Sequence, residues 1–536
     1  MIRRLARWID DRIGGSAFAE QALSKIFPDH WSFMLGEIAL YSFVVLVVTG
    51  IFLSFFFDPS VAETTYHGAY QPLQGTTMSE AYRSVVELSY DVRAGLVMRQ
   101  AHHWAAIVFI AAIVVHLLRV FFTGAFRRPR EINWIVGVTL LILAFFNGFT
   151  GYSLPDDLLS GTGLRIAYSI ALSVPLIGTW MAFLIFGGEF PAEAIIPRLF
   201  VTHILIVPGA IVALISVHLA LIWRQKHTDF AARGRRESNV VGPQLWPTYA
   251  AYSMGLFFAV AAVIMAMGGL VQVNPVWVYG PFRVSEVPSP AQPDWWLGWL
   301  EGALRIFPPW EARAFGHEIP NPFYPGVLVP SVTFGALYLW PFLEARFTGD
   351  RGPHHLLDRA RDHPVRTAFG ITALSFFVLL QVAASNDLLA HRLDASVATI
   401  SWTFRIVVPV VPPLLGYATY RLMTALQASA AERFAELPLR AVLRPAGDGA
   451  ERPEGAVAAY PPSADGAELI VYAEPDGRWR WCYRRPDDGV ELHSNRSYVS
   501  HEAAEHSALQ AYPDTPLARP AEASGPTSSG PRPTSG

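Results

Sequence analysis

The sequence predicts an all-α polytopic membrane protein, with eight transmembrane helices and a small α+β module near its C-terminus. Three observations support this prediction. The chain of 536 residues is 52% hydrophobic and only 16% charged, which does not fit a set of soluble domains. Eight apolar runs have about the 20-residue length that a bilayer requires. After about residue 433 the composition becomes polar, so the mean hydropathy of +0.30 averages two unlike parts.

Charge and cysteine content exclude several classes of protein. The formal net charge of −3 excludes a strongly basic nucleic-acid binder, so we expect no nucleic-acid partner. The single cysteine, Cys482, excludes intrachain disulfides, a cysteine-ligated iron–sulfur cluster and a C-x-x-C-H haem attachment. Any redox metal in this chain must therefore have nitrogen or oxygen ligands.

The eight runs predict transmembrane spans, and the basic residues between them predict their direction. The predicted spans are residues 33–57, 101–122, 134–151, 199–223, 249–271, 325–343, 367–384 and 400–422. Arg and Lys cluster in the N-terminal segment and after the second, fourth and sixth spans, whereas the other connections hold few of them. Under the positive-inside rule both termini face the cytoplasm, and the chain is a multi-pass protein of the cell membrane.

Residues 166–187 form a ninth stretch that is long enough to span. A span at this place would reverse every later connection and would put two of the basic clusters outside. We therefore predict a hairpin that lies at the outer surface and is broken at Pro175 and Gly178.

Five histidines lie inside the second and fourth predicted spans, where ionisable residues are costly and are candidates for function. A single histidine of this kind is more often a packing residue than a ligand, but the spacing here is regular. His102 and His116 lie about 40° apart in direction and about 21 Å apart along one helix. His203 and His218 lie about 60° and about 22 Å apart on another. His103 points about 140° away from His116 and should face elsewhere.

The two helices run in the same direction, from outside to inside, so their histidines can meet in pairs. His102 can meet His203 near the outer face, and His116 can meet His218 near the inner face. Two bis-histidine sites stacked across a membrane, in a chain with one cysteine, suit two low-spin b-type haems. Zinc fits less well, because tetrahedral zinc sites need three or four protein ligands.

Glycine and arginine positions favour the same assignment. A flat macrocycle inside a helical bundle needs backbones that come close together. Two pairs of glycines, each 14 residues apart, lie in the first and third spans: Gly36 with Gly50, and Gly137 with Gly151. Haem propionates need cations near the ends of the spans, where each arginine could instead be an interfacial side chain that snorkels to water. The candidates are Arg99, Arg119 and Arg198.

With these residues the chain closely resembles cytochrome b of the respiratory cytochrome bc1 and photosynthetic b6f complexes. The matching motifs are R-x-x-H at 99–102, H-x-x-R at 116–119, T-G-Y-x-L-P at 150–155, P-x-I-G-T from 175 and R-x-x-x-x-H at 198–203. The resemblance covers about residues 30–425. The fused eight-span chain, the 15-residue second spacing, the G-A-F-R-R-P-R-E stretch and the polar extension look most like the actinobacterial menaquinol:cytochrome c reductase.

In that family the loop between spans five and six carries P-E-W-Y, whose carboxylate accepts a proton from quinol at the outer site. The matching residues here are Pro293, Asp294, Trp295 and Trp296. The resemblance therefore implies that Asp294 is the catalytic carboxylate, although Asp is one methylene shorter than Glu. Tyr152 and Pro155 complete the implied outer quinol site. Without the histidines, the motif would be interpreted as an anchor in the interfacial aromatic belt.

The resemblance also implies a reaction and its partners. Quinol, of the menaquinol type, is oxidised at the outer site with two protons released outside. One electron goes to a Rieske iron–sulfur subunit, and the other crosses between the haems to quinone at an inner site. The inner-site candidates are Trp31, Ser32, Glu37, Lys226, His227 and Asp229. Glu37 could instead be an interfacial carboxylate held by an arginine. Further implied partners are a c-type cytochrome subunit, a second copy of the chain, a terminal cytochrome oxidase in a supercomplex, and lipids.

Two alternatives stay open on the residues alone. One is a membrane b-type cytochrome subunit that anchors another quinone-linked dehydrogenase, such as a formate dehydrogenase or a hydrogenase. Such subunits have fewer spans and lack the paired spacing of the histidines. The other alternative is a transporter whose histidines relay protons.

These elements predict the domain organisation. It comprises a cytoplasmic N-terminal segment at 1–32, a haem-binding cytochrome b four-helix bundle at 33–230, a C-terminal transmembrane half with the quinol-site loop at 231–425, a linker at 426–466, a small ββα module at 467–512 and a disordered tail at 513–536. The module resembles a short YegP-like domain of unknown function through its G-x-W-x-W strand and its S-Y-x-S helix start. This second resemblance implies no chemistry.

Overall fold

The computed structural model describes most of the chain, which divides into two compact units. The described residues are 4, 8, 10–12, 22–28, 30–232, 235–237, 241–287, 292–314, 316–435, 466–474, 477–485, 490–494 and 496–518. Unit 1 comprises residues 1–29, 227–251 and 449–536, and unit 2 comprises residues 30–226 and 252–448. Unit 2 is mostly helical and holds the predicted spans apart from the first residues of the fifth, whereas unit 1 contains a small β-sheet.

Eight helices of the described chain are long and apolar enough to cross a membrane, which confirms the predicted number of spans. They are η1 (Trp31–Met34) with α3 (Leu35–Ser54), α5 (Gly95–Phe122), α6 (Glu131–Ser153), α9 (Ile195–Val201) with η3 (Thr202–Ile206) and α10 (Val207–Gln225), η4 (Leu245–Tyr249) with α11 (Ala250–Leu270), η5 (Tyr324–Leu328) with α14 (Val329–Thr348), α15 (Pro364–Ala383) and α17 (Val397–Ala435). Several of these helices begin before the first residue of the predicted span, because their first turns include polar residues that the apolar runs left out. For example, α5 buries Arg99 and Gln100 in its first turns.

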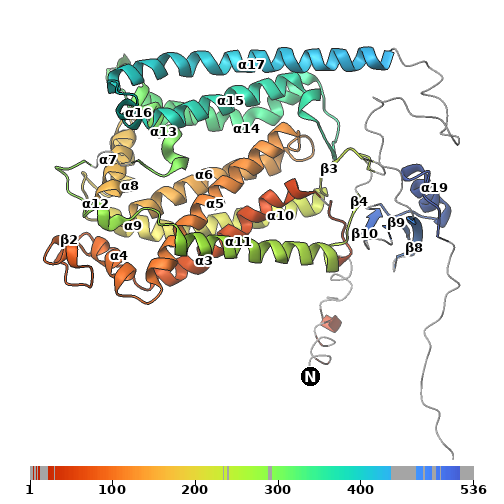
Figure 1. Ribbon diagram of the computed structural model, residues 1–536, viewed down its shortest axis with the longest axis horizontal. Coiled ribbons are helices and arrows are strands. Elements are labelled where there is room, and N and C mark those ends of the chain that lie inside the picture. The colour runs from red at the N-terminus through yellow and green to blue at the C-terminus, as the bar shows by residue number, and fades with distance from the viewer. Residues whose placement is uncertain are drawn as a thin grey trace, which may run out of the picture. The chain divides into compact units, whose positions relative to one another are not determined.

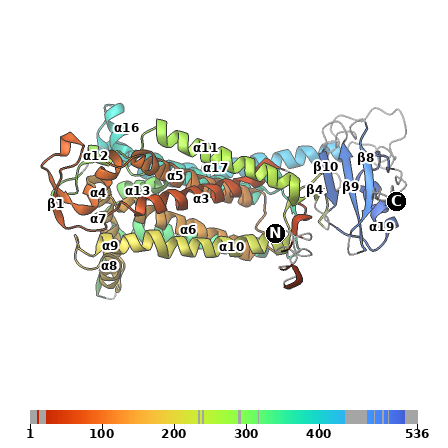
Figure 2. The ribbon, with the colours of Figure 1, turned by 90° about the horizontal axis from the view of Figure 1, so that it is seen from below.

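The helices α3, α5, α6 and α10 form a first bundle, seen in Figures 1 and 2. Within it α3 packs along α5, and α10 packs along α6. The core of the bundle consists of Ala39, Phe43, Phe109, Ile110, Ala112, Ala144, Val207, Ile211 and Trp296. Trp296 comes from α13 (Trp295–Ile306), a short helix that also packs against α15. A residue of a later connection therefore closes the core of the first bundle.

The stretch predicted as an outer hairpin folds as two short helices, α7 (Leu158–Leu172) and α8 (Gly178–Phe186), which pack against each other. A capping box begins α7: the Asp157 carboxylate accepts a hydrogen bond from the Ser160 backbone, and the Ser160 hydroxyl accepts one from the Asp157 backbone. The turn between the helices holds Leu176 at a φ of +69°. Neither helix has the length of a span, as the charge distribution predicts.

Shorter elements fill the connections. They are β1 (Glu63–Thr65), η2 (Gln71–Leu73), β2 (Thr77–Ser79), α4 (Glu80–Tyr90), β3 (Asp229–Phe230), α12 (Val276–Tyr279), β5 (Ala312–Ala314), β6 (His317–Ile319), β7 (Leu356–Leu357), η6 (Ala360–Asp362) and α16 (Asn386–Arg392). The hydroxyl of Ser79 caps the first turn of α4, which buries Tyr82 and Val86 against Val276 of α12. The connection between the first and second spans and the connection between the fifth and sixth spans thus share one small core.

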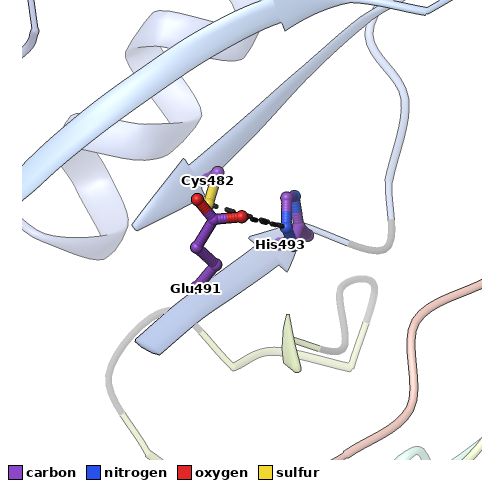
Figure 3. Close-up of side chains that lie close together, drawn as sticks. All are labelled: Cys482, Glu491 and His493. Carbon is purple, nitrogen blue, oxygen red and sulfur yellow. Dashed lines mark hydrogen bonds and ion pairs between the residues drawn. The ribbon is translucent and has the colours of Figure 1, made fainter. Parts of the chain in front are cut away.

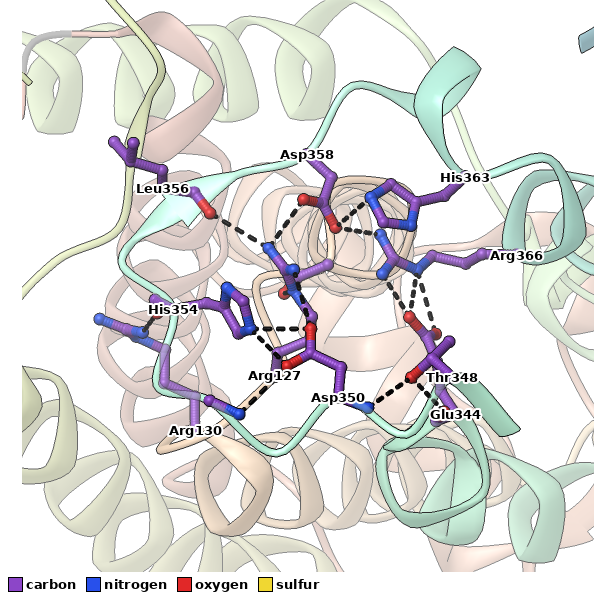
Figure 4. Close-up of polar contacts among 12 residues, drawn as sticks. Arg127, Arg130, Glu344, Thr348, Asp350, His354, Leu356, Asp358, His363 and Arg366 are labelled. Carbon is purple, nitrogen blue, oxygen red and sulfur yellow. Dashed lines mark hydrogen bonds and ion pairs between the residues drawn. The ribbon is translucent and has the colours of Figure 1, made fainter. Parts of the chain in front are cut away.

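A network of charges connects the loop between α5 and α6 to the segment between α14 and α15 (Figure 4). The Arg366 side chain, only 2% exposed, pairs with Glu344 and lies 2.8 Å from Asp358. Arg127 and His363 contact the same Asp358 carboxylate at 2.8 and 3.1 Å. Burial acts to raise the pKa of Asp358, but these hydrogen bonds and positive charges outweigh it and lower the pKa to about 2. Asp358 is therefore ionised, and its ion pairs connect the loop that follows α5, through Arg127, to α15, through Arg366.

Unit 1 contains an antiparallel sheet in the strand order β4-β10-β9-β8, with a helix packed against β8 and β9. The elements are β4 (Val241–Gly242), β8 (Glu468–Ala473), β9 (Trp479–Arg485), β10 (Val490–Ser494) and α19 (His501–Ala511). We predicted two strands before the helix, but the residues after the second turn form a third strand, and the connection after α10 supplies a fourth. The sheet and helix enclose a core of Val241, Ala467, Leu469, Trp481, Tyr483, Ala508, Ala511 and Tyr512.

Two predicted boundaries differ from the structure. The first residues of the predicted disordered tail, 513–518, are described, and Leu517 forms a parallel bridge to Leu469. Helix α17 continues to Ala435, beyond residue 425, where we expected the membrane half to end. The rest of the tail, most of the predicted linker and part of the N-terminal segment lie outside the described residues.

Candidate functional site

The structure brings His102 of α5 and His203 of η3 together inside the first bundle. Their ring centroids lie 6.2 Å apart, and the two rings are inclined by 75°. Two imidazoles that bind one metal ion from opposite sides, with metal–nitrogen distances of about 2 Å, have centroids about 6 Å apart. His203 lies in a π-helical turn, a distortion that is frequent at functional sites. The outer pair therefore has the separation that two ligands of one metal ion require.

Hydrogen bonds determine which nitrogen of each outer histidine carries the proton. The Thr49 hydroxyl donates to the Val45 carbonyl at 2.7 Å, so it accepts a hydrogen bond from Nδ1 of His102 at 2.9 Å. Nδ1 of His203 lies 3.0 Å from the Asn147 carbonyl oxygen, which can only accept. Both Nδ1 atoms are thus protonated, and both Nε2 atoms keep a lone pair for a metal.

Glycines lie directly beside the outer histidines. A Cβ atom at Gly151 would come closer than 3 Å to three atoms of the His203 ring, which real Cβ atoms essentially never do. A Cβ atom at Gly50 would lie 3.2 Å from Cε1 of His102. Glycine at these positions lets α3 and α6 approach the imidazole rings, and any flat group between them, without a side chain in the way.

The inner histidines follow the same pattern on the same helices. A Cβ atom at Gly36 would lie 3.3 Å from Cε1 of His116, and one at Gly137 would lie 3.8 Å from Cε1 of His218. Thus α3 lies against His116 and α6 lies against His218, as they do for the outer pair. All four predicted glycines therefore accompany the four predicted histidines.

Two predicted cations hold hydrogen-bond donors that the described residues do not use. Arg99 donates from one nitrogen to the Asn274 carbonyl at 3.2 Å, while its Nε and Nη2 atoms are buried without a described partner. The guanidinium of Arg119 lies 4.3 Å above the Phe33 ring, and its Nε and Nη2 atoms are likewise buried without a partner among the described residues. Such donors suit carboxylates. Together with the imidazoles and glycines, the residues present therefore fit b-type haem with its propionates.

Arg198, the third predicted cation, lies elsewhere. Its guanidinium donates to the carbonyls of Phe183 and Leu184 at 3.2 and 2.8 Å. These carbonyls belong to the last turns of α8, where basic side chains commonly satisfy free acceptors. In this structure Arg198 attaches the outer hairpin to α9, a role in which it needs no propionate.

A cavity of about 440 Å³ contains the outer histidines and most of the predicted outer quinol site. Its walls include His102, His103, His203, Tyr152, Pro155, Asp294 and Trp296. Trp296 is 2% exposed, stacks on Phe145 and packs against Gly148. Pro293 and Trp295 are not among the residues that line the cavity. Four of the six residues predicted for this site therefore share one space with the outer histidines.

Asp294 has a partner that the sequence did not reveal. Its carboxylate lies 3.0 Å from Nε2 of His103, and both side chains are largely buried. Helix geometry predicted only that His103 faces away from the haem-ligand direction. The adjacent histidine dipeptide was the one available signal, because two neighbouring positions on a helix point about 100° apart and can serve two groups.

The six predicted inner-site residues are divided between the units. In unit 2, Trp31 is 72% exposed, Ser32 is buried beside His30, and Glu37 accepts hydrogen bonds from the hydroxyls of Ser253 and Tyr41. The backbone carbonyl of Lys226 accepts a hydrogen bond from Arg130. In unit 1, His227 packs against Phe27, and the buried Asp229 pairs with Arg235 at 3.1 Å. Burial raises the pKa of Asp229 to about 6, although Arg235 opposes this shift.

Comparisons with known proteins show what the whole chain is similar to. Residues 107–281 match the family model described as cytochrome b(N-terminal)/b6/petB. The cytochrome bc1 complex cytochrome b subunit of Mycobacterium tuberculosis is 52% identical over 430 residues, which are 80% of this chain and 78% of that protein. The corresponding subunit of Streptomyces coelicolor is 48% identical over 424 residues, or 79% and 78% of the two chains. A chain of a hyperthermophilic respiratory complex III has a similar fold, with a TM-score of 0.55 at 20% identity over 77% of this chain and 99% of its own length.

Proposed function

Because the chain belongs to the family of cytochrome b subunits of the cytochrome bc1 complex, a quinol–cytochrome c reductase, we propose that it oxidises menaquinol at an outer site and passes one electron across the membrane to quinone at an inner site. Membership in this family decides against both alternatives, the anchor subunit of another dehydrogenase and the transporter. The chain is thus a multi-pass membrane subunit of a respiratory oxidoreductase.

The proposal assigns His102 and His203 to an outer haem and His116 and His218 to an inner haem. When bound, the two haems supply one-electron carriers at two depths of the membrane. The observation that carries the assignment is the 6.2 Å separation of the outer imidazoles, whose Nδ1 protons are both held by acceptors. Hydrogen bonds of this kind orient histidine ligands and make Nε2 a better donor to iron.

Arg99 and Arg119 complete the proposed cofactor sites. Each has two buried nitrogen donors that no described residue satisfies, and a buried guanidinium is most stable beside a carboxylate. We assign Arg99 to the propionates at the outer face and Arg119 to those at the inner face. Arg198 is the weaker candidate, since the carbonyls of α8 already accept from it.

Quinol oxidation needs a base close to the substrate hydroxyl, and Asp294 has that role in the proposal. Its carboxylate lines the same cavity as the outer histidines, and Tyr152 and Trp296 supply aromatic walls suited to a quinol ring. His103 lies within hydrogen-bond distance of Asp294, where it positions the carboxylate and can share the proton. The protons leave on the outer side, to which the positive-inside rule assigns this end of the bundle, with both termini cytoplasmic.

The inner quinone site is proposed around Glu37. This residue follows Gly36, which contacts His116, so its carboxylate lies at the depth of the inner pair. The hydroxyls of Ser253 and Tyr41 donate to it, and such donors stabilise a half-buried carboxylate in an apolar span. Trp31, Ser32 and Lys226 of unit 2, and His227 and Asp229 of unit 1, stay proposals for the same function.

The reaction implies partners. The chain holds one cysteine and cannot bind an iron–sulfur cluster through cysteines, so the first electron goes to a Rieske iron–sulfur subunit and then to a c-type cytochrome subunit. We further propose a homodimeric complex, associated with lipids and with a terminal cytochrome oxidase.

Two neighbouring histidines provide the decisive experiment. His203→Ala should remove the outer b-haem band from the reduced-minus-oxidised spectrum of the purified complex and leave the inner band. His103→Ala should keep both bands, because His103 faces Asp294 rather than His203. Unchanged spectra in His203→Ala would refute the assignment of His203 as a haem ligand. Loss of a haem band in His103→Ala would refute the assignment of the ligand role to His102 and not to His103.

A further inference from the structure

Three side chains with metal-binding donor atoms meet in unit 1, on elements that the proposed electron transfer does not use (Figure 3). Cys482 of β9 and His493 of β10 are directly opposite each other in the antiparallel register, so their side chains lie on the same face of the sheet. Glu491 precedes His493 by two residues on β10 and shares that face. One donor atom from each residue lies within 4.8 Å of the other two.

We propose that Cys482, Glu491 and His493 bind a zinc ion. Sγ of Cys482 lies 3.8 Å from Nε2 of His493, and that nitrogen lies 3.4 Å from an oxygen of Glu491. In tetrahedral zinc sites, with Zn–S distances of about 2.3 Å and Zn–N or Zn–O distances of about 2.0 to 2.1 Å, neighbouring ligand atoms are about 3.3 to 3.6 Å apart. Small side-chain adjustments thus close three corners of the tetrahedron and leave the fourth to water or another ligand.

Outer hydrogen bonds orient two of the three donors. The Tyr472 hydroxyl lies 3.0 Å from Nδ1 of His493, so a proton on Nδ1 leaves the Nε2 lone pair directed toward Cys482. Nε of Arg484 donates to Oε1 of Glu491 at 2.8 Å, while Oε2 is the oxygen nearer to His493. Zinc ligands regularly have such partners, which orient the ligand and tune its affinity for the metal.

The donor set favours zinc over other common cations. Calcium and magnesium prefer sites made of oxygen atoms, whereas zinc accepts sulfur, nitrogen and oxygen together. A thiolate and a carboxylate also balance the two charges of Zn²⁺.

Packing alone does not explain this placement of the cysteine. Trp481 and Tyr483, which flank Cys482 in β9, point to the opposite face and pack in the core with α19. Cys482 is 2% exposed but is not part of that core cluster. A buried thiol in an apolar core would serve as a small hydrophobic residue. Here it faces an imidazole and a carboxylate instead.

Zinc content and zinc X-ray absorption of the purified whole complex test this proposal. The complex is prepared without chelators, treated with a small excess of zinc chloride and freed of unbound metal. We expect about one zinc ion per chain, with one sulfur atom at about 2.3 Å and nitrogen or oxygen atoms at about 2.0 Å in its first shell. Cys482→Ser should lower the zinc content about tenfold or more, or retain zinc without the sulfur contribution.

His493→Gln should also lose zinc, while the control His506→Ala, an exposed histidine on α19, should keep it. Haem spectra and quinol oxidation should be unchanged in all three variants, so failure of the zinc proposal is distinguishable from failure of the proposed electron transfer. Equal zinc content in wild type and Cys482→Ser, with the same first shell, would overturn the proposal. A wild-type complex that takes up no zinc would overturn it as well.

Discussion

Nε2 of His103 lies 3.0 Å from the carboxylate of Asp294, although one residue belongs to the second span and the other to the connection between the fifth and sixth spans. The preceding residue, His102, faces His203 instead. One turn of α5 therefore presents neighbouring imidazoles to two different groups, a proposed haem iron and a proposed proton acceptor. His102 and Asp294 line the same cavity, so the proposed haem ligand and the proposed proton acceptor both border the space that we assign to quinol.

Asp294→Asn should slow quinol oxidation by about 100-fold, because an amide of nearly the same shape cannot accept the proton. Both b-haem bands should stay, since Asp294 is not a haem ligand in the proposal. Steady-state quinol:cytochrome c reductase activity, with the haem spectrum recorded on the same sample, measures both. Wild-type turnover in this variant would dismiss Asp294 as the acceptor.

His103→Ala should slow the same reaction less than Asp294→Asn, because the carboxylate stays in place but loses its hydrogen-bond partner. His103→Gln keeps a donor near Asp294 and should restore part of the rate. Equal rates in His103→Ala and His103→Gln would show that the hydrogen bond to Asp294 does not contribute to the reaction.

Gly151→Ala should remove the outer haem, because the added methyl group would collide with the His203 ring. The control is Gly209→Ala on α10, where an added Cβ atom would meet no described atom within 4 Å. Reduced-minus-oxidised spectra of the two purified variants give the comparison. Retention of the outer band in Gly151→Ala would mean that α6 does not have to approach His203 closely.

Arg99→Leu should lower the midpoint potential of the outer haem. Loss of a positive charge about 10 Å away is worth about 1 to 2 kcal/mol at an effective dielectric constant of about 20. For one electron this corresponds to roughly 60 mV. Arg198→Leu should leave the potential nearly unchanged, since its guanidinium is engaged with the carbonyls of α8. Redox titration of both variants decides between the two arginines, and a larger shift for Arg198→Leu would reverse the assignment.

Asp358→Asn should lower the free energy of unfolding of the complex by about 3 kcal/mol, because it leaves Arg366 buried beside an uncharged amide. The native pKa of Asp358 is depressed to about 2, so its stabilising contribution is complete above the unfolded-state value near 4. The contribution is lost as the pH falls from about 4 to about 2. The difference in melting temperature between the wild type and Asp358→Asn should therefore be largest at pH 7 and should become smaller below about pH 4.

The matched control for this charge is Asp350→Asn in the same network. The Asp350 side chain is 41% exposed and pairs with His354 at the edge of the network. Removal of the Asp350 charge should therefore change the melting temperature little. Equal effects of the two substitutions would show that burial of Asp358 does not determine the stability of the network.

The features that could be predicted from the sequence are those that repeat along a helix. Apolar runs reveal spans, and the 14- and 15-residue spacings place His102 near His203 once both helices run the same way. The pairing of His103 with Asp294 could not be predicted, because a helical wheel gives the direction of a side chain but not the loop that returns to meet it. Arg198 shows the same limit, since its partners are the carbonyls at the end of a hairpin helix.

The strand β4 was also beyond prediction. Val241 and Gly242 are too short a segment to show an alternating pattern, and their partner β10 lies about 250 residues later in the chain. The third strand of the C-terminal module alternates apolar and polar residues over Val490–Ser494, but this run of five residues is short, and its place between β9 and β4 depends on tertiary pairing. Both corrections concern pairings that are set by tertiary structure and not by local sequence.

The sheet of unit 1 has a consequence for the order in which the protein is made. Val241 is buried in the same core as Trp481, and Gly242 pairs with His493, yet the last four membrane spans are synthesised between them. During translation the β4 segment therefore has no strand partner until β10 has left the ribosome. A product cut short after the eighth span would carry all four histidines of the proposed haem sites but could not complete this sheet.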